Sequence, residues 1–238
     1  MTEDLDRFAG GYDTSRPYEF DNHLILHWYP RRVMARAQGT ALLELGVGHG
    51  YSTTSFAERF PRHVVVDGSR EVLARFAARF PDCPAERVCA YFETFATDEH
   101  FDVVVMGFVL EHVEDPALVL RRFRTFLKPG GQTFVAVPNA EALNRRVGKA
   151  AGLLEDLDRL SAGDLALGHR RLFTRARLTE LATAAGYAVA HVEGLFLKPL
   201  ATRQLQQLGL GEAVLQGFLS VGVEYPELCV GILMELTS

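Results

Sequence analysis

An open, doubly wound α/β sheet is the fold class that this sequence predicts, and two observations lead to it. Short apolar runs alternate along the chain with segments of helical spacing, the pattern of βαβ units and a parallel sheet. Several runs, such as "VVVD" and "DVVVMG", lack polar alternation, as expected of strands covered by helices on both faces. With 238 residues and 48% hydrophobic content, the chain is long enough to bury a large core.

The clearest elements lie before residue 140. Apolar runs predict strands at 41–45, 63–67, 87–91, 101–107 and 132–138. Helical spacing predicts connecting helices near 51–60, 69–80 and 115–127. We expect each helix to carry the chain from one parallel strand to the next.

After Pro138 the pattern loosens. A helical stretch at 141–154 precedes residues 155–173, which lack a clear period, as is typical of a lid or substrate loop. The remaining predicted elements are a helix near 174–185, a strand near 187–196, helical turns at 201–220 and a last strand within 227–236. We interpret 1–238 as one domain that carries a lid or substrate segment at 140–173.

Composition limits the classes of partner. The formal net charge is −5 and the basic residues are scattered, so we expect a small-molecule ligand and no nucleic acid. The three cysteines have no CxxC spacing and no nearby histidine cluster, which argues against a metal site and a disulfide framework. The acidic N-terminus and the lack of a long apolar run predict a cytoplasmic protein without a membrane partner. The sequence defines no oligomeric state.

A glycine-rich stretch, "ELGVGHG", follows the first predicted strand. Gly46, Gly48 and Gly50 let the chain turn tightly and let a ligand approach the backbone. Their spacing differs from the Gly-x-Gly-x-x-Gly of dinucleotide sites, so a structural turn and a nicotinamide cofactor both stay open. Asp67, at the end of the second predicted strand, can accept hydrogen bonds from both hydroxyls of a ribose. Together the glycines and this acid predict a nucleoside site.

Five segments, in their order and spacing, resemble the class I S-adenosylmethionine-dependent methyltransferases. They are "LLELGVGHG", "VVVDGS", "FETF", "FDVVVMGFVLEHVEDP" and "FLKPGGQTFVAVPN". The resemblance is strongest to a bacterial small-molecule branch, and "GHRRLF" and "FLKPL" extend it beyond residue 140. It implies a Rossmann-like, mostly parallel seven-stranded sheet in the order 3-2-1-4-5-7-6, with strand 7 antiparallel and helices on both faces.

The resemblance also implies which residues contact S-adenosylmethionine. The three glycines would line its methionine part, Asp67 would hold the ribose, and Glu44 would organise the glycine loop. The other implied contacts are Gly68 and Ser69 at the adenosine, Phe92 and Glu93 at the adenine, Met106 and Phe108 around the end of the fourth strand, and Tyr12 and Tyr18 in a covering arm at 1–35. A core role for Phe92, a surface role for Glu93 and a packing role for the two tyrosines stay open.

The acceptor end is predicted near the ends of the fourth and fifth strands. His112, with an ordinary pKa near 6.5, is a candidate proton acceptor or a structural residue. Asn139 and His169 are the other candidate catalytic residues, and Asn139, Arg171 and Phe173 are candidate substrate contacts. Relatives often carry histidine at the position of Phe108 and tyrosine at Phe173. These departures predict a less polar acceptor pocket.

Three functions follow from this reading. The first is methyl transfer to oxygen or nitrogen of a small specialised metabolite, which releases S-adenosylhomocysteine. The second is cyclisation of the cofactor itself, as in azetidine-2-carboxylate synthases, in which the α-amine attacks the γ-carbon and methylthioadenosine leaves. The third is a cofactor-binding module without catalysis.

Overall fold

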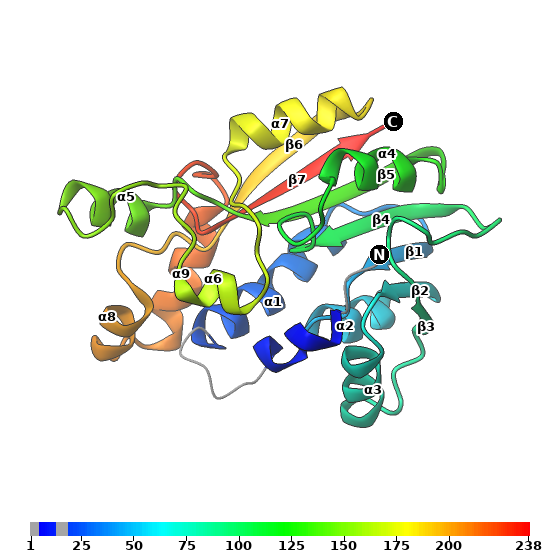
Figure 1. Ribbon diagram of the computed structural model, residues 1–238, viewed down its shortest axis with the longest axis horizontal. Coiled ribbons are helices and arrows are strands. Elements are labelled where there is room, and N and C mark those ends of the chain that lie inside the picture. Colours follow the sequence, from blue (N-terminus) through cyan, green and yellow to red (C-terminus); the bar gives the residue numbers. More distant parts are fainter. Residues whose placement is uncertain (1–4, 13–18) are drawn as a thin grey trace.

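One mixed sheet organises the computed structural model, which describes residues 5–12 and 19–238 (Figure 1). Its strand order is β3-β2-β1-β4-β5-β7-β6, and β7 runs antiparallel to both β5 and β6. The strands are β1 (Ala41–Leu45), β2 (Arg62–Asp67), β3 (Glu86–Cys89), β4 (Phe101–Gly107), β5 (Leu127–Pro138), β6 (Ala188–Leu195) and β7 (Gly231–Thr237). This confirms the predicted fold class and strand order.

Helices cover both faces of the sheet, as the unbroken burial of β1 requires. On one face lie α4 (Pro116–Arg124) and α7 (Arg175–Ala184), whose apolar side chains join the larger core cluster. On the other lie α1 (Glu19–Met34), α2 (Tyr51–Arg59), α3 (Arg70–Arg79), α8 (Thr202–Gln207) and α9 (Glu212–Gly222). Among the described residues, the helices are too short or too polar to span a membrane.

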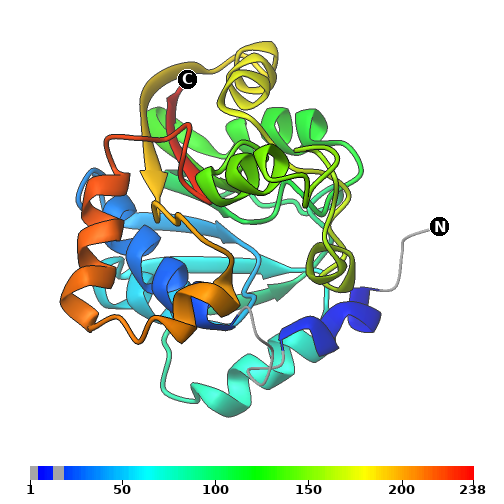
Figure 2. The same ribbon diagram turned by 90° about the vertical axis from the view of Figure 1, so that its left-hand side faces the viewer.

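Two segments outside the layers meet beside the sheet. The 3₁₀ helix η1 (Leu5–Tyr12) lies next to α6 (Ala162–Ala166) in Figure 2, and α5 (Leu143–Ala150) begins the same excursion after β5. A side chain on Gly168, just after α6, would lie 2.9 Å from the ring of Phe8. The N-terminal arm and the predicted lid segment therefore touch each other.

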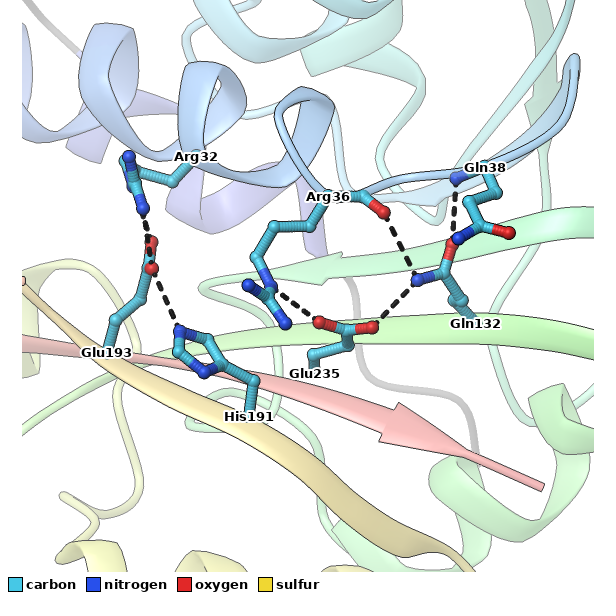
Figure 3. A network of polar contacts seen from close by, with 7 residues as sticks. All are labelled: Arg32, Arg36, Gln38, Gln132, His191, Glu193 and Glu235. Atoms are coloured by element: carbon cyan, nitrogen blue, oxygen red, sulfur yellow. Dashed lines mark hydrogen bonds and ion pairs between the residues drawn. The ribbon is translucent and has the colours of Figure 1, made fainter.

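Buried carboxylates of β6 and β7 fasten α1 and the turn after it to the sheet (Figure 3). Arg32 donates two hydrogen bonds, of 2.7 and 2.9 Å, to Glu193, whose side chain is 1% exposed. Arg36 donates to Glu235 at 2.6 Å, and Gln132 of β5 donates to the other oxygen of Glu235 at 2.7 Å. We call these five residues the α1 clamp, and it fixes the helix against the antiparallel part of the sheet.

Replacing Arg32 with methionine tests the clamp, because the change leaves the buried carboxylate of Glu193 without its guanidinium partner. We expect the free energy of unfolding to fall by about 2–3 kcal/mol, discounted from the value for fully buried pairs because Arg32 is partly exposed. Arg159→Met, which breaks the exposed pair with Glu155, should cost less than about 1 kcal/mol. Equal losses in urea denaturation would contradict a structural role for the clamp.

Candidate active site

A cavity of about 780 Å³ opens at the carboxyl ends of β1, β2, β4 and β5. This is the edge at which parallel α/β sheets bind ligands, and the volume lies in the range of roughly 300–1,000 Å³ common for small-molecule sites. Helix α1, η1 and the segment around α6 complete the wall. Eleven predicted site residues line it: Gly46, Gly48, Gly50, Asp67, Gly68, Ser69, Phe92, Phe108, His112, Asn139 and His169.

The glycine loop after β1 adopts left-handed backbone at all three glycines, with φ of 79°, 52° and 82°. A Cβ on Gly46 would lie 2.7 Å from Val109, and one on Gly50 would lie 2.6 Å from Phe76. Packing alone therefore explains glycine at these two positions. Gly48, between them, also lines the cavity, and without a side chain it lets a ligand approach its backbone.

Asp67 at the end of β2 joins the glycine loop to the start of α3. Its carboxylate accepts hydrogen bonds from the amide of Val47 at 2.9 Å and from the amide of Ser69 at 2.8 Å. Burial raises the pKa of Asp67, and these two bonds oppose that rise. Each oxygen keeps a second lone pair. The carboxylate can thus hold the loop and also accept a hydroxyl from a ligand.

Phe108 begins the loop after β4 with a backbone that is unusual for a residue with a side chain. Its φ is 56°, a conformation that costs on the order of 1–3 kcal/mol and occurs preferentially at functional sites. The ring packs edge-on against Tyr29 of α1, with 5.7 Å between centroids. A side chain on the preceding Gly107 would lie 2.4 Å from the Tyr29 hydroxyl. Close packing against α1 accounts for both the glycine and the position of the phenylalanine.

Four predicted contacts lie away from the cavity wall. Met106 and Phe173 are buried in the core, and Glu93 is exposed on the loop after β3. Arg171 donates its guanidinium hydrogen bonds to the carbonyls of Leu110, Val113 and Glu114. The structure therefore gives Arg171 a role in holding the loop after β4, and it does not bring these four side chains to a ligand.

Glu44 supports the glycine loop from below. Glu44 is buried beneath the loop, where it accepts a hydrogen bond from Ser52 at 2.9 Å and lies 3.0 Å from Nε2 of His63. It thus braces β1 against β2 and α2, in keeping with an organising role. Tyr12 ends η1, and Tyr18 lies outside the described residues.

Asn139, directly after β5, lines the cavity but has its amide engaged. Its Nδ2 donates to the carbonyls of Cys229 at 2.8 Å and Glu227 at 3.2 Å. Its Oδ1 accepts from the amide of Glu141 at 2.9 Å. These contacts hold the loop after β5 against the segment before β7, so Asn139 shapes this wall.

Four side chains converge where the loop after β4 meets the lid segment. They are Glu111, His112, Asp164 and His169, which we call the acid–histidine cluster. The rings of His112 and His169 are perpendicular, with centroids 4.7 Å apart, and ligand-type atoms of Glu111, His112 and His169 all lie within 4.8 Å. Such residue types also hold divalent metals, whereas the sequence predicted no metal site. Nδ1 of His169 lies 3.1 Å from Oδ1 of Asp164.

Burial and mutual charge spread the pKa values of the cluster widely. Burial raises the pKa of Glu111 to about 7, and burial together with the charge of His169 lowers that of His112 to about 3. Burial also disfavours charge on His169, but Asp164 and Glu111 outweigh this and raise its pKa. For Asp164, hydrogen bonds from His169 and Ser161 outweigh burial and lower the pKa to about 2. His112 is therefore neutral at pH 7 and a poor base.

Several cavity residues were absent from the sequence prediction. Ser161 and Asp164 form a capping box that starts α6, and the spacing Ser-x-x-Asp is the local sequence signal for it. Lys198, after β6, donates to Asp21 of α1 at 2.5 Å and to Thr202 of α8 at 2.9 Å. Asp21 lies 177 residues or more from the other two, so no local pattern brings it to them.

Replacing Glu111 with glutamine tests how much the ionised carboxylate destabilises the fold. Folding raises the pKa of Glu111 from 4.5 to about 7, so ionisation of this acid costs the folded state more than the unfolded state. The free energy of unfolding therefore falls as pH rises through that interval. We expect Glu111→Gln to match the wild type near pH 4 and to exceed it near pH 8 by up to about 3 kcal/mol in free energy of unfolding. Glu114→Gln, at an exposed position, should show no such pH-dependent gain. A Glu111→Gln protein less stable than wild type near pH 8 would refute the raised pKa.

Comparison with known proteins gives a family. Residues 18–192 match a family model described as a methyltransferase domain. The ubiquinone biosynthesis O-methyltransferase of Aeromonas salmonicida is 29% identical over 69% of this chain and 70% of its own. The cypemycin N-terminal methyltransferase of a Streptomyces species is 33% identical over 51% of each chain.

Solved structures agree on the fold. A possible histamine N-methyltransferase from Thermotoga maritima superposes with a TM-score of 0.64 at 18% identity, covering 98% of this chain and 97% of that one. The N-methyltransferase NodS from Bradyrhizobium japonicum, solved with S-adenosylhomocysteine, gives a TM-score of 0.61 at 14% identity and 99% coverage of each chain. The matched family model, the relatives and the shared fold show that the chain belongs to the class I methyltransferases, whose cofactor is S-adenosylmethionine.

Proposed function

We propose that this protein transfers the methyl group of S-adenosylmethionine to an oxygen or nitrogen atom of a small specialised metabolite. The observation that carries the proposal is that a single cavity joins the glycine loop and Asp67 to the acid–histidine cluster. Relatives named for O-methylation and for N-methylation both support a nucleophile of one of these two kinds.

The cofactor end of the cavity fits S-adenosylmethionine in its donor set. The open backbone at Gly48 suits close approach of the methionine part, and the free lone pairs of Asp67 suit ribose hydroxyls. Phe92 offers an apolar wall for the adenine. When bound, the cofactor supplies a strongly electrophilic methyl group, so the protein needs mainly to orient the acceptor and exclude water.

At the acceptor end, the Asp164–His169 pair suits removal of a proton from the acceptor. Asp164 orients the imidazole and makes it a stronger base, because it stabilises the charged form. His112 contributes a neutral ring to the wall, and its low pKa favours a packing or hydrogen-bonding role. Arg170 fastens this part of the lid, since it donates from Nε to the carbonyl of His112 at 3.0 Å.

The released nucleoside tests the reaction class. Purified protein is incubated with S-adenosylmethionine, first alone and then with a panel of small phenols, alcohols and amines, and the products are identified by mass spectrometry. We expect S-adenosylhomocysteine only in the presence of an acceptor, and His169→Ala should reduce its formation by roughly 10²-fold or more. Methylthioadenosine formed without an acceptor would instead indicate the cyclase. Tight cofactor binding without either product would indicate a non-catalytic module.

Replacing Asp67 with alanine tests the cofactor end. We expect the affinity for S-adenosylhomocysteine, measured by calorimetry, to fall by about 1.5–3 kcal/mol, because charged hydrogen bonds to the ribose are lost. Glu93→Ala is the matched control, since the structure places this acid away from the cavity. Unchanged affinity in Asp67→Ala, or an equal loss in Glu93→Ala, would show that the ribose has been assigned to the wrong acid.

A further inference from the structure

We infer that the acceptor is an amine, bound as its ammonium ion against Glu111; this rests on the proposed function and narrows it. The inference comes from the unsatisfied hydrogen-bonding capacity of the cavity wall and from its local charge.

Glu111 has an environment that a carboxylate rarely tolerates. Its side chain is 0% exposed, it lines the cavity, and neither of its oxygens has a hydrogen-bond partner among the described residues. A buried carboxylate without partners costs several kcal/mol, roughly, unless a cation or several donors meet it. An ammonium ion supplies both a positive charge and up to three N–H donors.

The contacts around Glu111 leave room for one cationic donor. Its carboxylate and that of Asp164 lie beside one imidazole whose charged form they favour, His169, while His112 is neutral. The charge of Arg171 also lowers the pKa of Glu111, but the hydrogen bonds of that guanidinium go to backbone carbonyls of the loop after β4. Among the described residues, no N–H group therefore meets the carboxylate of Glu111 directly.

Four lysine and arginine side chains line the wall, and each already has a contact, which disfavours an anionic acceptor. Lys198 pairs with Asp21, Arg145 donates to the carbonyl of Leu157 at 2.7 Å, and Arg170 donates to that of His112. The guanidinium of Arg7 lies over the ring of Phe8, 4.5 Å from its centroid. In the described part of the wall, most buried side-chain polar atoms without a hydrogen-bond partner are oxygens. Oδ1 of Asp21, like both oxygens of Glu111, is buried without a hydrogen-bond partner among the described residues.

The same arrangement lets the amine become a nucleophile. The ammonium ion gives one proton to the carboxylate of Glu111, and the freed lone pair on nitrogen forms the new bond to the methyl carbon. The sulfur–carbon bond breaks, its electron pair stays on sulfur, and the products are the methylated ammonium ion and S-adenosylhomocysteine. Glu111 then releases its proton to water, and the net yield is one proton per methyl group transferred.

A matched pair of probes tests this assignment. The affinities of 2-phenylethylamine and 2-phenylethanol are measured by calorimetry near pH 7.5 on protein saturated with S-adenosylhomocysteine and treated with EDTA. The aromatic probes suit the apolar side chains of the wall, including Phe8 and Phe108. We expect the amine to bind roughly tenfold or more tightly than the alcohol. Glu111→Gln should abolish this preference, and Glu114→Gln should preserve it.

Several results would overturn the inference. Equal affinities of the two probes, no binding of either, or an amine preference that survives Glu111→Gln would each do so. An amine preference that exists only before EDTA treatment, or Glu111-dependent binding of MnCl₂ or ZnCl₂ without amine binding, would assign Glu111 to a metal.

The probes also distinguish the inference from the proposed function. Methylation of a phenol by a protein that shows no amine preference would leave methyl transfer intact and remove the amine. Glu111-dependent binding of the amine, without methylation of any acceptor, would support the binding site and count against methyl transfer.

Discussion

The attachment of α1 to the antiparallel part of the sheet is the interaction on which the site depends. Glu193 and Glu235 project from β6 and β7 and hold Arg32 and Arg36, so the helix lies across the sheet in a fixed position. The same helix carries Asp21 and Tyr29 into the cavity wall. A parallel sheet alone would provide the ribose end of the site, but its acceptor side needs a wall that the last two strands hold in place.

The acceptor side of the site is built from a strained backbone and a buried carboxylate in one loop, instead of from regular secondary structure. Phe108 turns out of β4 in a left-handed conformation, and Glu111 follows three residues later without a partner for its carboxylate. Arg171 ties the carbonyls of Leu110 and Val113, on either side of Glu111, to the lid segment. Backbone strain and an unpartnered buried carboxylate both destabilise a fold, and strained residues cluster at functional sites. Here both features lie in the loop after β4, at the carboxyl end of the sheet.

The sequence predicts the sheet well because strand signals are local. The predicted bounds of β1 and β4 agree with the structure, since each is an apolar run with sharp ends that a single acidic residue interrupts. The prediction for β5 began at residue 132, whereas the strand begins at Leu127, because "KPGG" reads as a turn. In the structure Gly130 has a φ of 77°, and the pairing register shifts between Phe101 and Val103.

The site was less predictable because its polar contacts join segments far apart in the chain. The glycines and Asp67 follow strands directly, and the sequence placed them at the cavity. Loss of polar residues at Phe108 and Phe173 predicted a less polar pocket, yet Phe173 lies in the core and the lid supplies Asp164 and His169. Packing across the sheet decides which side of a loop faces a ligand, and the hydrophobic periodicity of the sequence does not reveal it.

The contact between Phe8 and Gly168 has a consequence for the timing of each turnover. Two separate pieces of chain meet over the cavity, and glycine at 168 lets the aromatic ring rest directly on the backbone of the other piece. A molecule that passes between these two pieces must first break this contact. For that route, the lifetime of one small apolar contact, on the μs–ms scale of lid motions, limits the rate of exchange, whatever the speed of the chemistry beneath it.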